Sequence, residues 1–143
     1  MTFLLDVNVL IALIDPAHVQ HDAAHAWFAV QGRLSWATCP LTENGVLRIV
    51  GNARYPNSPG TPAAVAPLMA GLRSLPGHVF WTDEISLLDP ERFDTARLLT
   101  TGQVTDSYLL ALARFHDGQL ATFDRRLVAD AVLDGTGSLH LIP

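Results

Sequence analysis

The chain is short of the residues that mark secreted, membrane-spanning and strongly basic proteins. Its single cysteine, Cys39, cannot form an internal disulfide and fits a reducing compartment. The apolar N-terminal run follows no positively charged segment and is interrupted by Asp6, Asn8 and Asp15, so neither a signal peptide nor a membrane span is expected. Lysine is absent and the formal net charge is -5, which argues against a broad basic surface that grips nucleic acid. We expect a cytoplasmic protein.

The residues that are present indicate one domain, residues 1–143, with a sizeable core. Hydrophobic residues make up 49% of the chain, which hints at an apolar face for a partner or for self-association. The nine basic residues are all arginine, and arginine binds phosphate through two parallel hydrogen bonds. A local site for nucleic acid therefore remains open.

Five short apolar runs predict β-strands, and stretches with helical spacing lie between them. The predicted strands are 3–6, 34–38, 79–82, 119–123 and 139–142. The predicted helices are 9–14, 19–30, 41–50, 63–74 and 107–115, with a shorter piece at 93–100. Alternating strands and helices are typical of a parallel sheet that is covered on both faces. The sequence thus predicts an α/β fold, a three-layer α/β/α sandwich with a central, mainly parallel sheet.

Four acidic residues stand at junctions between the predicted strands and helices: Asp6, Glu43, Asp106 and Asp124. Asp6 follows the first strand, and ligand crevices of open α/β sheets form at the carboxyl ends of strands. Each of the others also has a purely structural interpretation. Thr42 and Thr105 are predicted helix N-caps, which would put Glu43 and Asp106 in first turns, where an acid stabilises the helix dipole. Asp124 alone would be a turn residue.

Convergence of the four acids would give them a common chemistry. Two carboxylates ~4 Å apart repel by about 4 kcal/mol at an effective dielectric of ~20, so a tight cluster needs a cation. Oxygen ligands suit Mg²⁺ and Mn²⁺. The hypothesis is that a metal-activated water attacks a phosphodiester in line, while one or two metal ions stabilise the charge that develops.

The segments around these acids together resemble the PIN-domain family, in particular the VapC-type ribonuclease toxins of bacterial toxin–antitoxin pairs. The matching segments are Leu5-Asp6-Val-Asn8-Val-Leu, Leu41-Thr-Glu43-Asn-Gly-Val-Leu-Arg48, Val104-Thr-Asp106-Ser-Tyr-Leu-Leu-Ala-Leu-Ala and Ala121-Thr-Phe-Asp124-Arg-Arg-Leu. Two departures from the family pattern, Ser107 and the pair Asn44-Gly45, remove none of the acids.

The resemblance implies an α/β/α sandwich and a metal-dependent endoribonuclease with Mg²⁺ or Mn²⁺ as cofactor. Its catalytic and metal-binding residues would be Asp6, Glu43, Asp106 and Asp124. The residues that match the family's supporting positions are Asn8, Thr105 and Thr122. The expected partners are an RNA substrate, a cognate antitoxin and a second copy of the chain in a homodimer.

Arginine residues beside these segments are candidates for RNA contact. Arg48 precedes a Pro- and Gly-rich loop at 52–62, which carries Arg54 and Tyr55, and Arg125 and Arg126 follow Asp124. A solvated connector and a solvated helix start are the alternative interpretations. His21 and His25 share one helical face, but no third ligand has matching spacing, which favours a solvated or interfacial face over a metal site.

Three other functions remain as alternatives. A haloacid-dehalogenase-like phosphatase needs a second Asp two residues after the first, and Asn8 stands there instead. A nucleotide-binding domain would have a Gly-rich loop after the first strand, which is missing here. A protein with a PIN-like fold that acts only by binding is the third, and the four acids argue against it.

Overall fold

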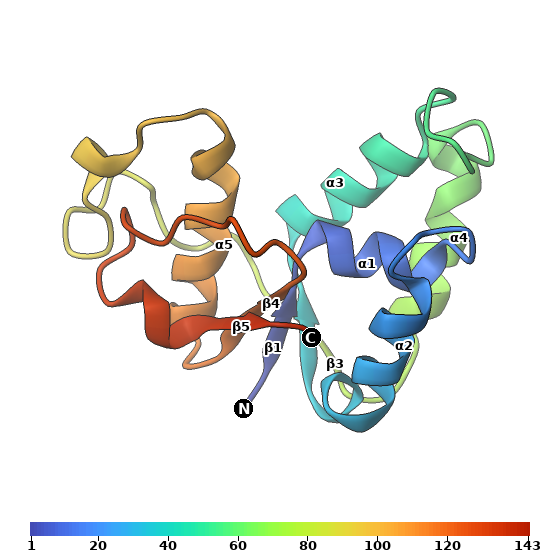
Figure 1. The fold of residues 1–143 in the computed structure, drawn as a ribbon, viewed down its shortest axis with the longest axis horizontal. Coiled ribbons are helices and arrows are strands. Elements are labelled where there is room, and N and C mark those ends of the chain that lie inside the picture. Colours follow the sequence, from blue (N-terminus) through green and yellow to red (C-terminus); the bar gives the residue numbers. More distant parts are fainter.

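The computed structural model covers residues 1–143 and is built around a five-stranded sheet in the order β3-β2-β1-β4-β5 (Figure 1). Every neighbouring pair of strands is parallel. The strands are β1 (Phe3–Leu5), β2 (Trp36–Thr38), β3 (His78–Phe80), β4 (Gln119–Thr122) and β5 (Leu139–Leu141). The predicted parallel sheet is confirmed, and each strand is shorter than its predicted run.

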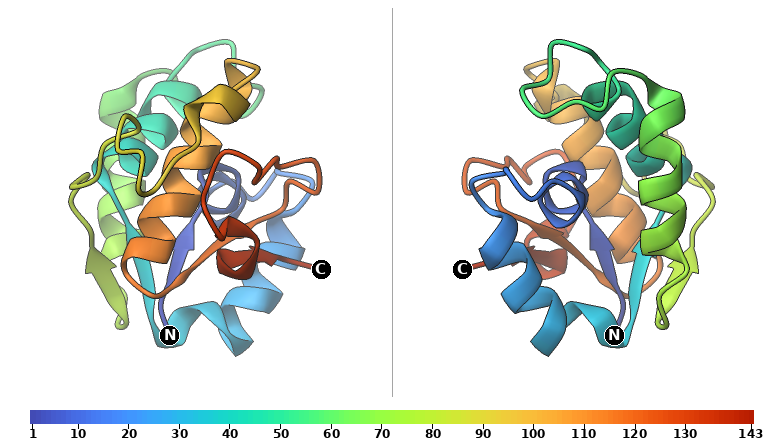
Figure 2. Two further views of the ribbon diagram at one scale, coloured as in Figure 1. Left: turned by 90° about the vertical axis from the view of Figure 1, so that its left-hand side faces the viewer. Right: turned by 90° about the vertical axis from the view of Figure 1, so that its right-hand side faces the viewer.

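Five α-helices connect the strands. They are α1 (Val7–Ile14), α2 (His21–Val30), α3 (Pro40–Val50), α4 (Pro62–Arg73) and α5 (Gly102–Phe115). Helices α1 to α4 lie on one face of the sheet and α5 on the other, as the side views of Figure 2 show. The predicted α/β/α sandwich is confirmed. None of the helices is both long enough and apolar enough to span a bilayer.

Side-chain alternation along the strands divides the core into two clusters, one on each face of the sheet. Leu5 and Trp36 point toward α1 and α2, whereas Leu4 and Leu120 point toward α5. All four side chains are fully buried. The central strand β1 is therefore covered on both faces, which is why residues 3–5 read as a continuous apolar run.

The strand order reverses direction at β1. From β1 the chain moves outward through β2 to β3, and then returns to the other side of β1 to form β4 and β5. In doubly wound sheets, such a reversal opens a crevice at the carboxyl ends of the two strands on either side of it. Here these strands are β1 and β4, which lead directly into Asp6 and Asp124.

One predicted helical segment is wrong, and the alternative interpretation of a helix start after Asp124 is not borne out. Residues 93–100 contain only a 3₁₀ turn at Thr95–Arg97, because Phe93 is buried in an isolated antiparallel bridge with Val132. The chain after Asp124 forms a turn at Arg125 and Arg126 and does not begin a helix.

Candidate active site

Asp6 joins β1 to α1 and is almost completely buried. It is the N-cap of α1, and its Oδ1 accepts a hydrogen bond of 2.7 Å from the backbone N–H of Val7. Its Oδ2 accepts one of 2.8 Å from the hydroxyl of Thr122, the last residue of β4. Because both oxygens are bonded, the carboxylate is fixed at the crevice between the two strands.

Thr122 and Asn8 form a small polar network that supports Asp6. The Thr122 hydroxyl accepts hydrogen bonds from Asn8 Nδ2 at 3.2 Å and from the backbone N–H of Asp124 at 3.0 Å. Asn8 Oδ1 in turn accepts the N–H of Phe123 at 3.4 Å. Asn8 and Thr122 thus lie where the sequence predicted supporting residues, in contact with the backbone that carries two of the acids.

Asp6, Asp106 and Asp124 lie close enough to influence one another electrostatically. The pKa of Asp106 is raised to about 6, first by burial and then by the negative charges of Asp6 and Asp124. Burial also raises the pKa of Asp6; the hydrogen bonds from Thr122 and Val7 counteract this, while the charge of Asp124 adds to it. The structure therefore brings three of the four predicted acids into one region of negative charge.

The position of Asp106 within its helix differs from the prediction. Helix α5 begins at Gly102, so Thr105 is not the N-cap and Asp106 lies beyond the first turn. The N-cap is Thr101, and it makes no side-chain cap hydrogen bond. Gln103 holds the segment before the helix, since its Oε1 accepts the backbone N–H groups of Leu99 and Thr100. The Ser/Thr/Asp/Asn rule could not decide between Thr101 and Thr105, because both are threonines.

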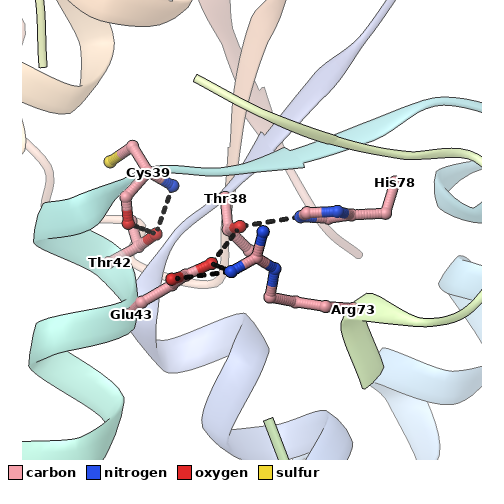
Figure 3. Close-up of polar contacts among 6 residues, drawn as sticks. All are labelled: Thr38, Cys39, Thr42, Glu43, Arg73 and His78. Atoms are coloured by element: carbon pink, nitrogen blue, oxygen red, sulfur yellow. Dashed lines mark hydrogen bonds and ion pairs between the residues drawn. The ribbon is translucent and has the colours of Figure 1, made fainter. Parts of the chain in front are cut away.

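Glu43 lies in the first turn of α3, as predicted, but takes part in a separate network (Figure 3). Thr38 Oγ1 donates a hydrogen bond of 2.7 Å to Glu43 Oε2, and Arg73 Nη1 lies 3.3 Å from both carboxylate oxygens. The N-cap of α3 is Cys39 rather than the predicted Thr42, which instead bonds the Cys39 backbone through a capping box. Glu43 is therefore already paired with a cationic side chain of the same chain.

A divalent cation fits the donor set formed by the three aspartates. All the donors are carboxylate oxygens, which hard cations prefer, and burial together with mutual repulsion penalises their charge. As the side chains stand, no three Asp, Glu, His or Cys residues are arranged so that they could hold a metal ion. Binding a cation would therefore involve side-chain adjustment at this crevice, for which Asp106 and Asp124 are only partly buried.

The predicted RNA-contacting arginines are all exposed. Arg48 lines a hollow of about 300 Å³ together with Asn52, Arg54 and Tyr55. Arg125 donates a hydrogen bond of 3.2 Å to the carbonyl of Ile142, and the backbone N–H of Arg126 bonds Asp124 Oδ1 at 2.9 Å. The structure thus gives two arginine groups, one beside Asp124 and one at the far end of α3.

His21 and His25 have a role that the sequence did not indicate. Their ring nitrogens lie 2.7 Å from the carbonyl of Ala12 and 2.8 Å from that of Leu13. These two carbonyls belong to the last turn of α1, where the helix has no further backbone N–H groups to donate to them. The two histidines therefore cap one helix from the surface of the next.

Comparison with known proteins places these features in a wider context. The model of the PIN domain family matches residues 3–131. The chain is 45% identical to Ribonuclease VapC44 of Mycobacterium tuberculosis over 141 residues, which cover 99% of this chain and 98% of that protein. It is 44% identical to Ribonuclease VapC39 of the same organism over 131 residues, 92% of this chain and 94% of the relative.

A solved structure with the same fold is the crystal structure of Mycobacterium tuberculosis VapC20, described as a toxin that cleaves the sarcin-ricin loop. Its TM-score is 0.57 at 15% sequence identity, and the match covers 89% of this chain and 97% of that one. At this identity the likeness concerns the fold alone.

Proposed function

The chain belongs to the PIN-domain family of VapC-type ribonucleases, and from this we propose that it is a metal-dependent endoribonuclease, the toxin of a VapBC-type toxin–antitoxin pair. The observation that carries the proposal is the position of Asp6 and Asp124 at the ends of the paired strands β1 and β4, near enough to Asp106 for their charges to raise its pKa. Full-length relatives that are named ribonucleases support the choice of RNA as substrate.

We infer that Asp6, Asp106 and Asp124 hold Mg²⁺ or Mn²⁺, with Glu43 as a fourth acid. The bound cation would supply an activated water and positive charge for in-line attack on a phosphodiester. Asp6 provides a carboxylate that its hydrogen bonds to Val7 and Thr122 keep in one orientation. Asp106 and Asp124, which have more freedom, adjust around it.

Exposed arginines are suited to hold the RNA backbone on either side of this crevice. Arg125 and Arg126 directly follow Asp124, whereas Arg48 lies in the last turn of α3 and Arg54 in the loop after it. Neither Arg48 nor Arg54 forms an ion pair within the chain, so their guanidinium groups are available for phosphate. Two arginine groups of this kind reconcile nucleic-acid binding with a net charge of -5.

The proposed partners follow from membership of the family. They are a cognate antitoxin that blocks the site and a second copy of the chain in a homodimer. The apolar composition is compatible with both. An RNA substrate and a single free cysteine, Cys39, fit a protein that works in the cytoplasm.

A phosphatase mechanism is disfavoured by the surroundings of Asn8. The position two residues after Asp6, which would carry a general acid, is Asn8, and its amide has no acidic proton to give. Its oxygen and nitrogen bond Phe123 and Thr122. Asn8 thus has a supporting role, and a phosphoaspartyl intermediate on Asp6 would have no acid to protonate its leaving group.

The central test is cleavage by the purified protein, freed of any bound partner, with Mg²⁺ or Mn²⁺ and a mixture of single-stranded and structured RNAs. Asp6→Asn is expected to lower the cleavage rate at least about 10²-fold, since it removes one charge from the metal site and changes the hydrogen bond from Thr122. Asp22→Asn, on the exposed face of α2, is the matched control and should cleave normally.

Four results would count against the proposal. Cleavage that continues in excess chelator would exclude a metal mechanism. Normal cleavage by a folded Asp6→Asn protein would exclude Asp6. Tight RNA binding with no cleavage under any metal would favour a binding module, and a phosphoenzyme trapped on Asp6 would favour the phosphatase.

A further inference from the structure

Arg73, the last residue of α4, reaches across to Glu43 on α3. Its Nη1 lies 3.3 Å from each oxygen of the carboxylate, and its guanidinium also covers the ring of Phe80 at 5.0 Å. The side chain is therefore held between an acid and an aromatic ring, as Figure 3 shows for the acid. A guanidinium placed in this way supplies Glu43 with the positive charge that a metal would otherwise supply.

A second arm of the network holds the same carboxylate from the sheet. The hydroxyl of Thr38, which is fully buried at the end of β2, donates to Glu43 Oε2. Thr38 has only one hydroxyl hydrogen, so the contact of 2.7 Å with His78 Nε2 requires the histidine to be the donor. Hydrogen bonds are therefore donated in one direction, from His78 to Thr38 and from Thr38 to Glu43. Both carboxylate oxygens of Glu43 have partners.

Glu43 thus has a positively charged partner, whereas the three aspartates have one another's negative charges nearby. Asp6, Asp106 and Asp124 repel one another, whereas Glu43 already has Arg73 and Thr38. An acid that is shared between an arginine and a metal must give up some of the first interaction to make the second. The Arg73 side chain is 41% exposed and that of Glu43 is 20% exposed, so their ion pair is weak enough to exchange.

We propose that Arg73 is a resident counter-cation that competes with the divalent metal for Glu43 and so weakens metal binding at this site. The inference rests on the proposed metal-dependent function. Asp6, Asp106 and Asp124 hold the cation first, and Glu43 completes the set only when it leaves Arg73. Arg73 is in this sense a positioning residue, which acts through Glu43.

The test is a double-mutant cycle on Mn²⁺ affinity, measured by isothermal titration calorimetry on the full chain without RNA. Arg73→Met keeps an apolar stem over Phe80 but removes the charge, and it should tighten Mn²⁺ binding about two- to fivefold. In the Glu43→Gln background the same substitution should change nothing, because there is no carboxylate left to compete for. Arg73→Lys, which retains the charge, should bind Mn²⁺ nearly as the natural chain does.

Arg97→Met is the matched control, since Arg97 pairs with Asp94 at 3.3 Å on another part of the surface. It should leave Mn²⁺ affinity unchanged. Weaker or unaltered binding by Arg73→Met would overturn the inference. Equally tighter Mn²⁺ binding in both backgrounds would also overturn it, because the charge of Arg73 would then act on the metal at long range and not through Glu43. If neither the natural chain nor Arg73→Met binds Mn²⁺, the metal site of the proposed function fails as well.

Discussion

Asp15 is a buried acid that takes no part in the candidate active site. It is only 6% exposed and follows the last residue of α1. Its carboxylate accepts hydrogen bonds from the hydroxyl of Tyr55, from Asn57 Nδ2 at 2.6 Å and from the backbone N–H of Ala17 at 2.9 Å. Two of these donors belong to the Pro- and Gly-rich loop after α3, so Asp15 fixes that loop to the end of α1.

The ionisation of Asp15 should stabilise the fold. Burial raises its pKa, but the hydrogen bonds from Tyr55, Asn57 and Ala17 outweigh burial, and the net shift is downward. The pKa of Tyr55 is raised to about 12, first by burial and then by the hydrogen bond to Asp15 and its charge. An acid with a lowered folded-state pKa adds stability above its unfolded pKa and loses it as the pH falls through the folded value.

We therefore expect Asp15→Asn to lower the free energy of unfolding by about 1–3 kcal/mol at pH 7, where a charged acceptor is removed. The deficit should shrink as the pH drops below about 4, because the unfolded chain then takes up a proton first and the folded carboxyl follows only at its lower pKa. Urea unfolding of both proteins at a series of pH values checks this, with Asp22→Asn as the control. A deficit that does not depend on pH would mean that the charge is unimportant.

Asp106 should show the opposite dependence. Its pKa of about 6 lies above the ordinary value of 3.8, so its ionised form costs stability at neutral pH. In metal-free protein, Asp106→Asn should raise the free energy of unfolding by about 1–2 kcal/mol above pH 6, and the gain should fade toward pH 4. Chemical denaturation in chelator measures the difference. A loss of stability at pH 7 would contradict this assignment of repulsion and burial.

At the scale of elements, helix α3 carries the acid Glu43 on one side and the RNA-binding candidate Arg48 on the other. Glu43 points toward Arg73 of α4, while Leu41 packs against the cluster around α5. Arg48 lies two turns after Leu41 and so shares its side of the helix. Beyond it, Arg54 and Tyr55 complete the hollow at the C-terminal end.

This arrangement predicts that Arg48 and Arg54 contribute to RNA affinity and not to the chemical step. In the Asp6→Asn background, replacing both by Ala should weaken binding of a fluorescent single-stranded RNA about three- to tenfold near 0.1 M salt. The slope of log affinity against log salt should become shallower by about 0.7 for each phosphate that the variant no longer neutralises. Arg33→Ala is the control, because Arg33 is exposed in the 3₁₀ turn before β2 and belongs to neither arginine group. An unchanged slope would remove these residues from the RNA path.

Element positions were predictable from the sequence wherever an apolar pattern alone decides them. The runs around Leu4 and Leu120 gave correct strands because both faces of those strands are buried. The first residues of the helices were harder to predict. Thr42 and Thr105 looked like N-caps, but the true N-caps are Cys39, with a capping box, and Thr101, which is followed by Gln103 bonded to the preceding segment. Such caps depend on rotamers and on neighbouring turns, which residue type alone does not reveal.

Across the whole molecule, the sequence located the acids but not their partners. Asp6 and Asp124 could be placed at the same sheet edge because both follow buried strands. The pairing of Glu43 with Arg73 could not be predicted, since it depends on how α4 packs along α3. The hydrogen bonds of Asp15 to the loop were missed for the same reason: partners 40 residues or more apart leave no local pattern.

The central place of β1 has a consequence for the life of the chain. β1 leaves the ribosome first but cannot pair with β4 until β4 has been synthesised. The hydrogen bond between Asp6 and Thr122 joins residues 116 positions apart. Chains synthesised at about 5–20 residues per second therefore spend several seconds without a formed crevice. A nuclease assembled this late is harmless to the ribosome and message that produce it, until nearly the entire polypeptide has emerged.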